Sequence, residues 1–250
     1  MSWRIVTVTR RCKLDLKMNY LVVRSEDEVK RIHLDEISVL MLENTAISIT
    51  GCLLCELSRR KIKVIFCDAQ RNPCAELVSQ YGSYDCSRKI EKQIKWSDET
   101  KGLVWSEIIA EKIRKQSEHL EFWGKNDESQ LLKSYTTQIE FADKTNREGH
   151  AAKVYFNALF GMDFTRTSDC AINAALNYGY SLIVSAFSRE IVANGYLTQL
   201  GIFHSNMSNQ FNLASDMMEP YRILVDRRVR ECNFTEFESE QKHIMLDMLN

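Results

Sequence analysis

Residues 63–85, KVIFCDAQRNPCAELVSQYGSYD, mark the point at which the chain changes from one structural pattern to another. Lys63–Asp68 is the most strand-like run in the sequence, and Ala75–Val78 is a further short run after a turn. The segment Gly82-Ser83-Tyr84-Asp85 is rich in turn residues, and we interpret it as a linker. The sequence therefore predicts a β-rich part before this point and a different kind of structure after it.

The first eighty residues predict mostly strands, with one crossing helix. β-Branched residues and alternating polarity favour strands. The runs that show these features are Trp3–Thr9, Tyr20–Arg24, Val29–His33, Ser38–Leu42 and Ala46–Ile49. Arg10, Arg11 and Lys13 predict a basic turn between the first two runs. Residues 50–61 predict a helix whose inner side carries leucines.

From residue 87 onward, apolar side chains recur at helical spacing. The predicted helices cover residues 97–123, 128–140, 145–160 and 169–193. We therefore predict an α+β fold. Its domains are a mainly β N-terminal domain, residues 1–80, a linker, residues 81–96, and a mainly α-helical domain, residues 97–250.

The composition is that of an ordinary globular protein, with 44% hydrophobic and 27% charged residues. A net charge of −1 excludes a polycationic binder, so any contact with nucleic acid would depend on local basic clusters. No apolar run is long enough to span a membrane and no signal peptide precedes Trp3, so we expect a cytoplasmic protein. The eight cysteines are scattered through apolar segments, which favours reduced thiols. Cys52-x-x-Cys55 has no second ligand pair at zinc-site spacing.

A second informative stretch is residues 201–226, GIFHSNMSNQFNLASDMMEPYRILVD. His204 follows a short apolar run, and Asp216 and Glu219 are three residues apart, so both carboxylates would point the same way on a helix. Carboxylate oxygens suit Mg²⁺ and Mn²⁺, and Mn²⁺ also accepts an imidazole. The pattern is therefore typical of a metal site.

The same two acids also fit a capping box, with Asp216 as the N-cap and Glu219 at the third helical position. Pro220 would then lie in the first turn, where its missing N–H costs little. In this interpretation the core face behind the cap would consist of Met218, Tyr221, Val225 and Val229. The two interpretations are compatible, because a cap can hold a ligand in place.

Glu148 is a third candidate ligand. It shares one helical stripe with Ala152, Tyr155 and Leu159, so the acid should lie on the inward face. A buried carboxylate needs a partner, and a metal bound by His204 and Glu219 would supply one. Thr145-x-x-Glu148 also matches a capping box, which leaves a purely structural role open.

Several short motifs in the helical half resemble one known family. They are E-G-x-A-A-x-x-Y-F at 148–156, F-x-R-x-x-D and N-A-A-L-N-Y-G-Y within 164–180, and G-x-x-H with D-x-x-E-P-x-R-x-x-V-D within 201–226. Together they resemble CRISPR-associated protein one, the spacer-acquisition endonuclease and integrase family. The branch it is most similar to accompanies the single-protein RNA-guided DNA cutters. The resemblance covers most of the chain.

The resemblance implies that Glu148, His204 and Glu219 are the catalytic metal ligands for Mg²⁺ or Mn²⁺, with Asp216 as an accessory acid. The implied reaction joins the 3′-OH ends of a short spacer duplex to the CRISPR repeat. The implied partners are double-stranded DNA, a second copy bound through the β domain, and the small second CRISPR-associated adaptation protein. Family members continue further, so we expect the helical domain to be cut short at its C-terminal end.

Basic residues near the candidate site predict contacts with the DNA backbone. These residues are Arg166, Arg222, Arg227, Arg228 and Arg230. Ion pairs within the protein, or a solvated helix face, are the alternatives. No glycine-rich phosphate loop indicates ATP use. A structure-selective metallonuclease or a non-catalytic DNA-binding scaffold remains the alternative to an integrase.

Overall fold

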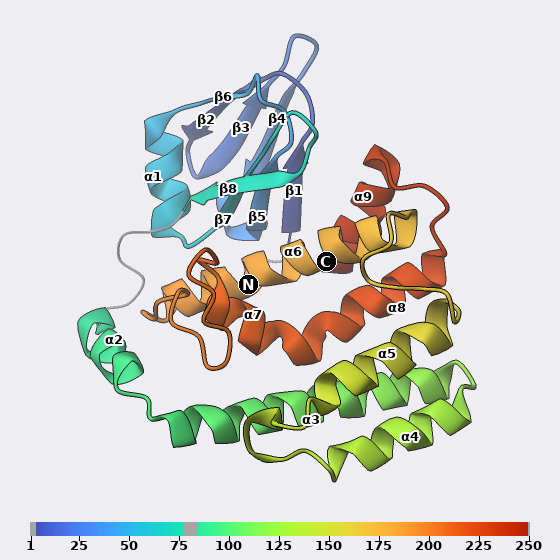
Figure 1. Ribbon diagram of the computed structural model, residues 1–250. Coiled ribbons are helices and arrows are strands. Elements are labelled where there is room, and N and C mark those ends of the chain that lie inside the picture. Colours follow the sequence, from blue (N-terminus) through green and yellow to red (C-terminus); the bar gives the residue numbers. More distant parts are fainter. Residues whose placement is uncertain (1–3, 78–84, 250) are drawn as a thin grey trace. The chain divides into compact units, whose positions relative to one another are not determined.

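The computed structural model describes residues 4–77 and 85–249 (Figure 1). Strands with one α-helix among them occupy the described chain up to residue 77, and the regular elements from residue 86 onward are helices. The predicted α+β class is therefore confirmed. The chain packs as two compact units that divide near residue 84, and each unit is described by itself.

The N-terminal unit contains two four-stranded sheets among its described residues. In the first, β1 (Arg4–Val8), β5 (Ile37–Leu42) and β7 (Lys63–Cys67) are parallel neighbours, and β8 (Pro73–Leu77) pairs antiparallel with β7. The second has the order β4 (Val29–His33), β3 (Tyr20–Arg24), β2 (Lys13–Lys17) and β6 (Ser48–Ile49). Helix α1 (Gly51–Arg59) begins after Thr50, whose hydroxyl accepts the N–H of Leu53.

Strand β2 corrects the sequence prediction, which assigned Lys13 to a basic turn. The run KLDLK alternates, and it pairs antiparallel with the whole of β3. Leu14 is fully buried in the core of this unit and Leu16 packs against that core. The burial of alternate leucines therefore outweighs the charge of the flanking lysines.

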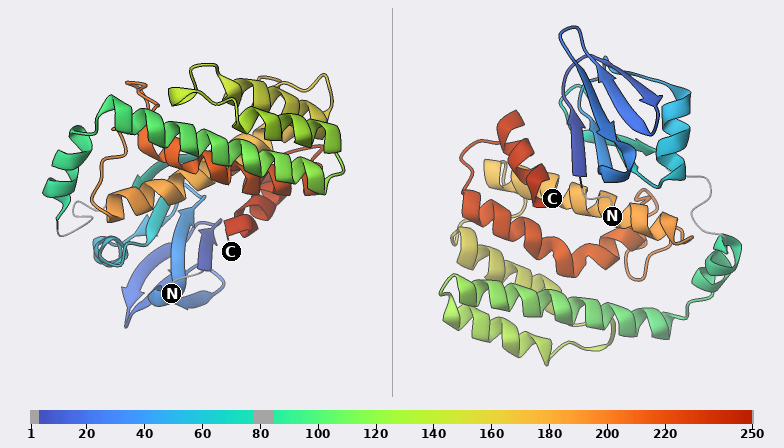
Figure 2. Two further views of the ribbon diagram at one scale, coloured as in Figure 1. Left: turned by 90° about the horizontal axis from the view of Figure 1, so that it is seen from below. Right: turned by 180° about the vertical axis from the view of Figure 1, so that it is seen from behind.

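The second unit is helical in the described residues. Its helices are α2 (Cys86–Ile94), α3 (Asp98–Phe122), α4 (Asn126–Thr136), α5 (Arg147–Phe160), α6 (Ala171–Ala193), α7 (Asn212–Met218), α8 (Arg222–Cys232) and α9 (Ser239–Leu246). Helix α3 packs against α4, α5 and α8, while α6 packs against α7, α8 and α9 (Figure 2). Helix α2 lies within the segment 81–96 that we predicted as a linker.

Close helix packing requires one glycine in α6. A Cβ atom on Gly179 would lie 2.5 Å from Cγ1 of Val225 and 2.7 Å from the terminal carbon of Met245. Val225 and Met245 are both fully buried. The small residue therefore lets α6 approach α8 and α9, and it brings the segment after Glu219 against the core.

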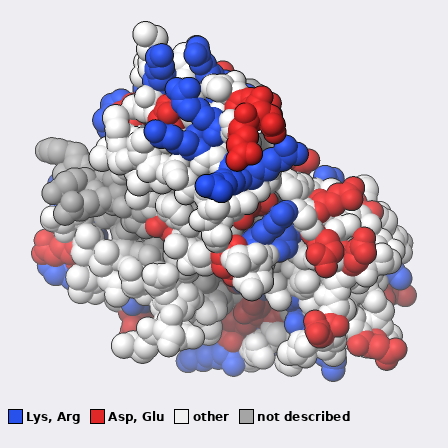
Figure 3. All heavy atoms as spheres, turned by 90° about the horizontal axis from the view of Figure 1, so that it is seen from above, with Lys and Arg blue, Asp and Glu red and all other residues white. Residues whose placement is uncertain are grey.

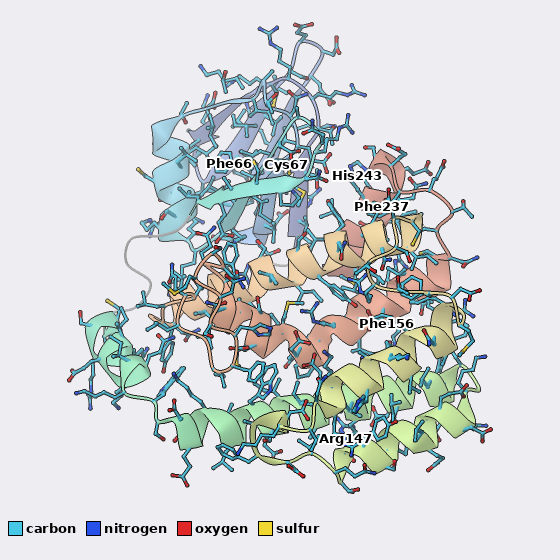
Figure 4. The ribbon with its side chains drawn as sticks, in the orientation of Figure 1. Phe66, Cys67, Arg147, Phe156, Phe237 and His243 are labelled. Carbon is cyan, nitrogen blue, oxygen red and sulfur yellow. The ribbon has the colours of Figure 1, made fainter. Side chains whose placement is uncertain are left out.

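The start of α5 differs from the predicted capping box at Thr145. The side chain of Asn146 accepts the N–H of Gly149, and the carboxylate of Asp143 accepts the N–H groups of Arg147 and Glu148. Arg147, labelled in Figure 4, stacks on Tyr135 of α4 with 5.4 Å between its guanidinium carbon and the ring centroid. The capping prediction was wrong because Asp143 and Asn146, on either side of Thr145, accept these amides in its place.

Other features of the described residues bear on the sequence predictions. None of the helices in the described part of the chain is long and apolar enough to cross a membrane. All eight cysteines are free thiols. On the face drawn in Figure 3, a group of basic side chains lies beside a group of acidic ones, which agrees with a net charge near zero.

Candidate functional site

Glu148 and Glu219 converge on one cationic side chain, that of Lys112. Its Nζ lies 2.5 Å from Oε1 of Glu148 and 2.6 Å from Oε2 of Glu219. Lys112 belongs to α3, Glu148 to the first turn of α5, and Glu219 to the 3₁₀ turn Glu219–Tyr221 between α7 and α8. Three segments far apart in the sequence thus place two carboxylates around a single positive charge.

Glu219 is held in a charged state inside the protein. Only 3% of its side chain is exposed, and Arg222 pairs with its Oε1 at 2.8 Å. Burial alone would raise the pKa of Glu219, but the charges of Lys112 and Arg222 outweigh burial and lower that pKa to about 2. Burial also disfavours the charged form of Lys112, yet Glu219 and Glu148 raise its pKa overall. Glu219 and Lys112 are therefore both charged at neutral pH.

Asp216 is not the N-cap of a helix that contains Glu219. It lies inside α7 and is completely buried. Its carboxylate accepts the backbone N–H groups of Ile202, Phe203 and His204. The capping-box interpretation is wrong, because these amides from an earlier loop are the partners of the acid.

The predicted core face behind that cap is correct at three of its positions. Met218, Val225 and Val229 are fully buried, whereas Tyr221 is 45% exposed. The 3₁₀ turn between α7 and α8 changes the helical phase at Tyr221, and its ring lies against Phe187 and beneath Lys115.

His204 is oriented by Asp216. Its Nδ1 lies 2.6 Å from Oδ1 of Asp216, so Nδ1–H donates to the carboxylate and Nε2 is left for another partner. The bond to Asp216 raises the pKa of His204, and the charges of Glu219 and Glu148 add to that rise. The structure therefore brings His204 within electrostatic range of both acids.

Two further features hold the His204 loop in place. A Cβ atom on Gly201 would lie 2.2 Å from the carbonyl oxygen of His204 and 2.8 Å from Oδ2 of Asp216, so only glycine fits. The ring of Phe203 stacks on buried Trp105 of α3 with 4.3 Å between centroids, and Trp105 meets His204 edge-on. The loop is thus fixed between α3 and α7.

His204 also lines a polar hollow of about 620 Å³ within the helical unit. Its walls come from α2, the start of α3 and the loop 199–212, and they include Gln93, Lys101 and Asn209. Neither Glu148 nor Glu219 is among the described residues that line it. Of the three candidate ligands, His204 is thus the one that lines this hollow among the described residues.

The side chains of the site suit a hard divalent cation. The carboxylates of Glu148 and Glu219 and the free Nε2 of His204 form a ligand set that Mn²⁺ accepts, and Mg²⁺ binds the carboxylates. The two acids already accommodate a positive charge between them. As placed, no three His, Cys, Asp or Glu side chains among the described residues are close enough to hold an ion together, and Lys112 occupies the position between the acids.

The predicted DNA-binding arginines differ in the contacts that their side chains make within the protein. Arg222 pairs with Glu219 and stacks on Tyr180, with 4.5 Å between its guanidinium carbon and the ring centroid. Arg166 donates to Asn173 and Asn177 of α6, and it stacks on Phe156 at 5.6 Å. Figure 4 shows Phe156 on α5, on the side that faces α8.

The remaining arginines lie on α8. Arg228 contacts the carbonyl oxygen of Ile244 at 3.4 Å, and Arg230 stacks on Trp123 at 5.0 Å. Arg227 is the exposed member of this group. Their role in DNA binding stays a prediction.

A buried polar network beside the site was missed from the sequence. Trp123 Nε1–H donates to Nε2 of His119, and Nδ1 of His119 lies 2.7 Å from the hydroxyl of Tyr155. The hydroxyl of Tyr180 donates to Asp226, which is 1% exposed. The hydroxyls of Tyr180 and Tyr155 both counter the rise that burial causes in the pKa of this acid. Since Arg222 stacks on Tyr180 and pairs with Glu219, the network reaches the acids of the site. Helical spacing placed Tyr155 on the inward face of its helix, but the partners of Tyr155 come from other helices.

Comparison with known proteins gives one family. The family described as CRISPR associated protein Cas1 matches residues 5–247. A CRISPR-associated endonuclease Cas1 from Neisseria meningitidis serogroup C (strain 8013) is 35% identical over 230 residues, which cover 92% of this chain and 75% of that protein.

Solved structures share the fold at low identity. A CAS1 protein from Thermotoga maritima superposes with a TM-score of 0.81 at 17% identity, covering 98% of this chain and 88% of that one. A casposase bound to integration product gives 0.76 at 16% identity, over 100% of this chain and 82% of that chain. A chain of a Cas6-RT-Cas1–Cas2 complex superposes with a TM-score of 0.73 at 18% identity, covering 98% of this chain and 32% of that chain. The resemblance found in the sequence motifs is confirmed, and the chain belongs to the Cas1 family of CRISPR-associated endonucleases.

Proposed function

We propose that this chain is a metal-dependent integrase of CRISPR adaptation, which joins the 3′-OH ends of a short spacer duplex to the CRISPR repeat. The observation that carries the proposal is the convergence of Glu148 and Glu219 around one cationic position, with His204 within electrostatic range of both. A casposase with the same fold has been solved with an integration product, which supports strand joining as the reaction of this fold.

In the proposed mechanism, Glu148, His204 and Glu219 would hold one Mg²⁺ or Mn²⁺. That ion, when bound, supplies Lewis-acid polarisation of the scissile phosphodiester. Asp216 fixes the tautomer and direction of His204, as carboxylates behind metal-bound imidazoles do. Arg222 donates to both carboxylate oxygens of Glu219 and so holds this side chain together with Lys112.

The transesterification exchanges one phosphodiester for another. The 3′-hydroxyl of the spacer duplex gives its proton to solvent as its oxygen forms a new P–O bond. The P–O bond to the 3′-oxygen of the repeat strand breaks, and that oxygen takes a proton from solvent. The step therefore needs no ATP, in agreement with the absence of a phosphate-binding loop motif in the sequence. The protein contributes to the reaction by positioning the reacting groups and by stabilising the charge that develops.

The proposed partners are double-stranded DNA, a second copy of the chain and the small second CRISPR-associated adaptation protein. A Cas6-RT-Cas1–Cas2 complex contains a chain of this fold, which supports the last of these. We propose that the homodimer forms through the β-rich unit, whose described sheets end in β1 and β8 and in β4 and β6, because the edges of sheets are surfaces that proteins cover. Light scattering at micromolar concentration should give a dimer mass, and a monomer mass would contradict the proposal.

The decisive experiment uses a supercoiled plasmid that carries a CRISPR repeat, a short labelled duplex and Mn²⁺. We expect joined product from a duplex with 3′-OH ends and none from a duplex with 3′-dideoxy ends. Glu148→Gln should abolish joining, whereas Glu111→Gln on the surface of α3 should not, because Glu111 pairs with Arg114 away from the site.

The name endonuclease carried by the Neisseria relative favours one second candidate, a structure-selective nuclease that uses water. In the same assay this candidate would cut the plasmid with either duplex and join neither. Joined product that forms without a 3′-OH, or metal-dependent cutting alone, would replace the integrase by this nuclease.

A further inference from the structure

Lys112 contributes a positive charge between the two acids of the site, Glu148 and Glu219. Only 9% of its side chain is exposed, and it lies within 2.6 Å of a carboxylate oxygen from Glu148 and one from Glu219. It comes from α3, whose neighbouring turns bury Ile109, Ile113 and Gln116. Lys112 therefore belongs to the inward face of its helix and not to a solvated basic surface.

The fixed charges around this point balance without any added ion. Glu148 and Glu219 contribute two negative charges, and Lys112 and Arg222 contribute two positive ones. Asp216 is engaged separately with His204 and three amides. Two carboxylates held close together, with Glu219 buried and Glu148 30% exposed, are costly unless a cation lies between them, and Lys112 supplies that cation.

The oxygens held by Lys112 belong to the same carboxylates that would bind a metal. Metal–oxygen contacts of Mg²⁺ are about 2.0–2.1 Å, so an ion bound to both acids would occupy the space that the ammonium fills. An ammonium left about 4 Å from a dication would be repelled by several kcal/mol even at an effective dielectric constant of about 20. Binding of the ion through both acids therefore requires Lys112 to withdraw.

We propose that Lys112 is a place-holding cation that competes with the divalent ion for Glu148 and Glu219. With no metal bound, it keeps the two acids together and, with Arg222, balances their charge. When a divalent ion enters, the ammonium leaves the carboxylates, and part of the binding free energy of the ion is used to displace it. Lys112 thus stabilises the metal-free protein and weakens its affinity for metal. This inference rests on the proposed metal site.

The test compares Mn²⁺ binding by calorimetry in the wild-type chain and in Lys112→Met. We expect the variant to bind Mn²⁺ about tenfold more tightly or better, because the competing charge is gone. Lys133→Met is the matched control, since Lys133 forms an exposed ion pair with Glu121 at 2.6 Å. The control should bind Mn²⁺ like the wild type.

Thermal unfolding gives a second readout that does not depend on activity. In EDTA, Lys112→Met should unfold at a lower temperature than the wild type, because Glu148 and Glu219 then repel each other. Saturating Mn²⁺ should raise the unfolding temperature of the variant more than that of the wild type. A variant that folds only with Mn²⁺ would support the proposal in the same way.

If Lys112→Met does not fold even with Mn²⁺, Lys112→Gln replaces it, since glutamine keeps a hydrogen-bond donor without the charge. Unchanged or weaker Mn²⁺ binding in the neutral variant, with an unchanged response of the unfolding temperature, would overturn the place-holding role. Loss of Mn²⁺ binding in the wild type as well as in the variant would instead overturn the proposed metal site, so the two failures are distinguishable.

Discussion

Oδ1 of Asp216 lies 2.6 Å from Nδ1 of His204, and the same carboxylate accepts three consecutive backbone N–H groups from Ile202 to His204. A buried acid thus aims one imidazole and also fixes the loop that carries it. We predict that Asp216→Ala weakens Mn²⁺ binding by about tenfold or more, because loss of a partner behind a metal-binding histidine has effects of that size. Calorimetry with Mn²⁺ measures this directly.

Asp216→Asn should be nearly as damaging as the alanine variant. An asparagine has one acceptor oxygen in place of two, and its NH₂ group would face the backbone donors of the loop. Asp98→Asn, an exposed change in the first turn of α3, is the control for loss of one negative charge. Mn²⁺ binding by Asp216→Ala equal to that of the wild type would show that His204 is aimed by something else.

The sequence predicted the strands of the N-terminal unit well where polarity alternates. The predicted Tyr20–Arg24 and Val29–His33 coincide with β3 and β4, and Lys63–Asp68 overlaps β7. β2 was missed because its lysines resemble a basic turn, although Leu14 and Leu16 alternate as a buried face requires. There the local composition favoured a turn, whereas the alternation of leucines favoured a strand. The structure has the strand, because it buries the leucines.

The candidate site was predictable only in part. His204, Asp216 and Glu219 lie within one short stretch, so spacing alone marked them. Lys112 was not recognised from the sequence, because charge is visible in a sequence and tertiary partners are not. A signal was present, since Lys112 falls three residues after buried Ile109 and four before buried Gln116, on the inward stripe of α3.

His119 predicts a loss of stability in mild acid. Burial, with smaller effects from Arg227 and Arg230, lowers the pKa of His119 from 6.5 to about 4. Below pH 6.5 the unfolded chain binds a proton that the folded chain refuses, so stability falls as pH decreases from 6.5 towards 4. The full effect is at most about 3 kcal/mol, from 1.36 kcal/mol per unit of pKa.

The comparison that isolates this effect is wild type against His119→Gln, which keeps a donor and an acceptor for Tyr155 and Trp123. Between pH 7.5 and 5.5, urea unfolding should show the wild type losing about 1 kcal/mol more than the variant. Asp226 acts in the opposite direction, because burial raises its pKa to about 6, but it is present in both proteins. Equal losses in the two proteins would assign the pH dependence to other groups.

The hydroxyl of Tyr180 should stabilise the fold through its hydrogen bond to Asp226. Tyr180→Phe removes the tyrosine hydroxyl that donates to this buried carboxylate, and we expect a loss of about 1–3 kcal/mol in the free energy of unfolding. The double variant with Asp226→Asn should lose less than the sum of the single variants, because the two side chains share one interaction. Additive losses would contradict coupling. Tyr196→Phe, sixteen residues along the chain, is the control.

The last prediction separates the arginines of α8 by what each one touches. Arg227 is exposed, whereas Arg228 reaches the carbonyl of Ile244 and Arg230 covers Trp123. We therefore expect Arg227→Ala to lower the slope of log affinity against log salt by about 0.9, the value for one phosphate contact on duplex DNA, with little change in stability. Arg230→Ala should mainly lower the free energy of unfolding, by about 0.5–1 kcal/mol for the lost stacking on Trp123.

Fluorescence anisotropy with a labelled duplex at several salt concentrations gives the slopes, and urea unfolding gives the stabilities. A triple variant at 227, 228 and 230 that keeps the wild-type salt slope would remove this helix face from the DNA interface, and the backbone contacts would then have to come from another part of the chain.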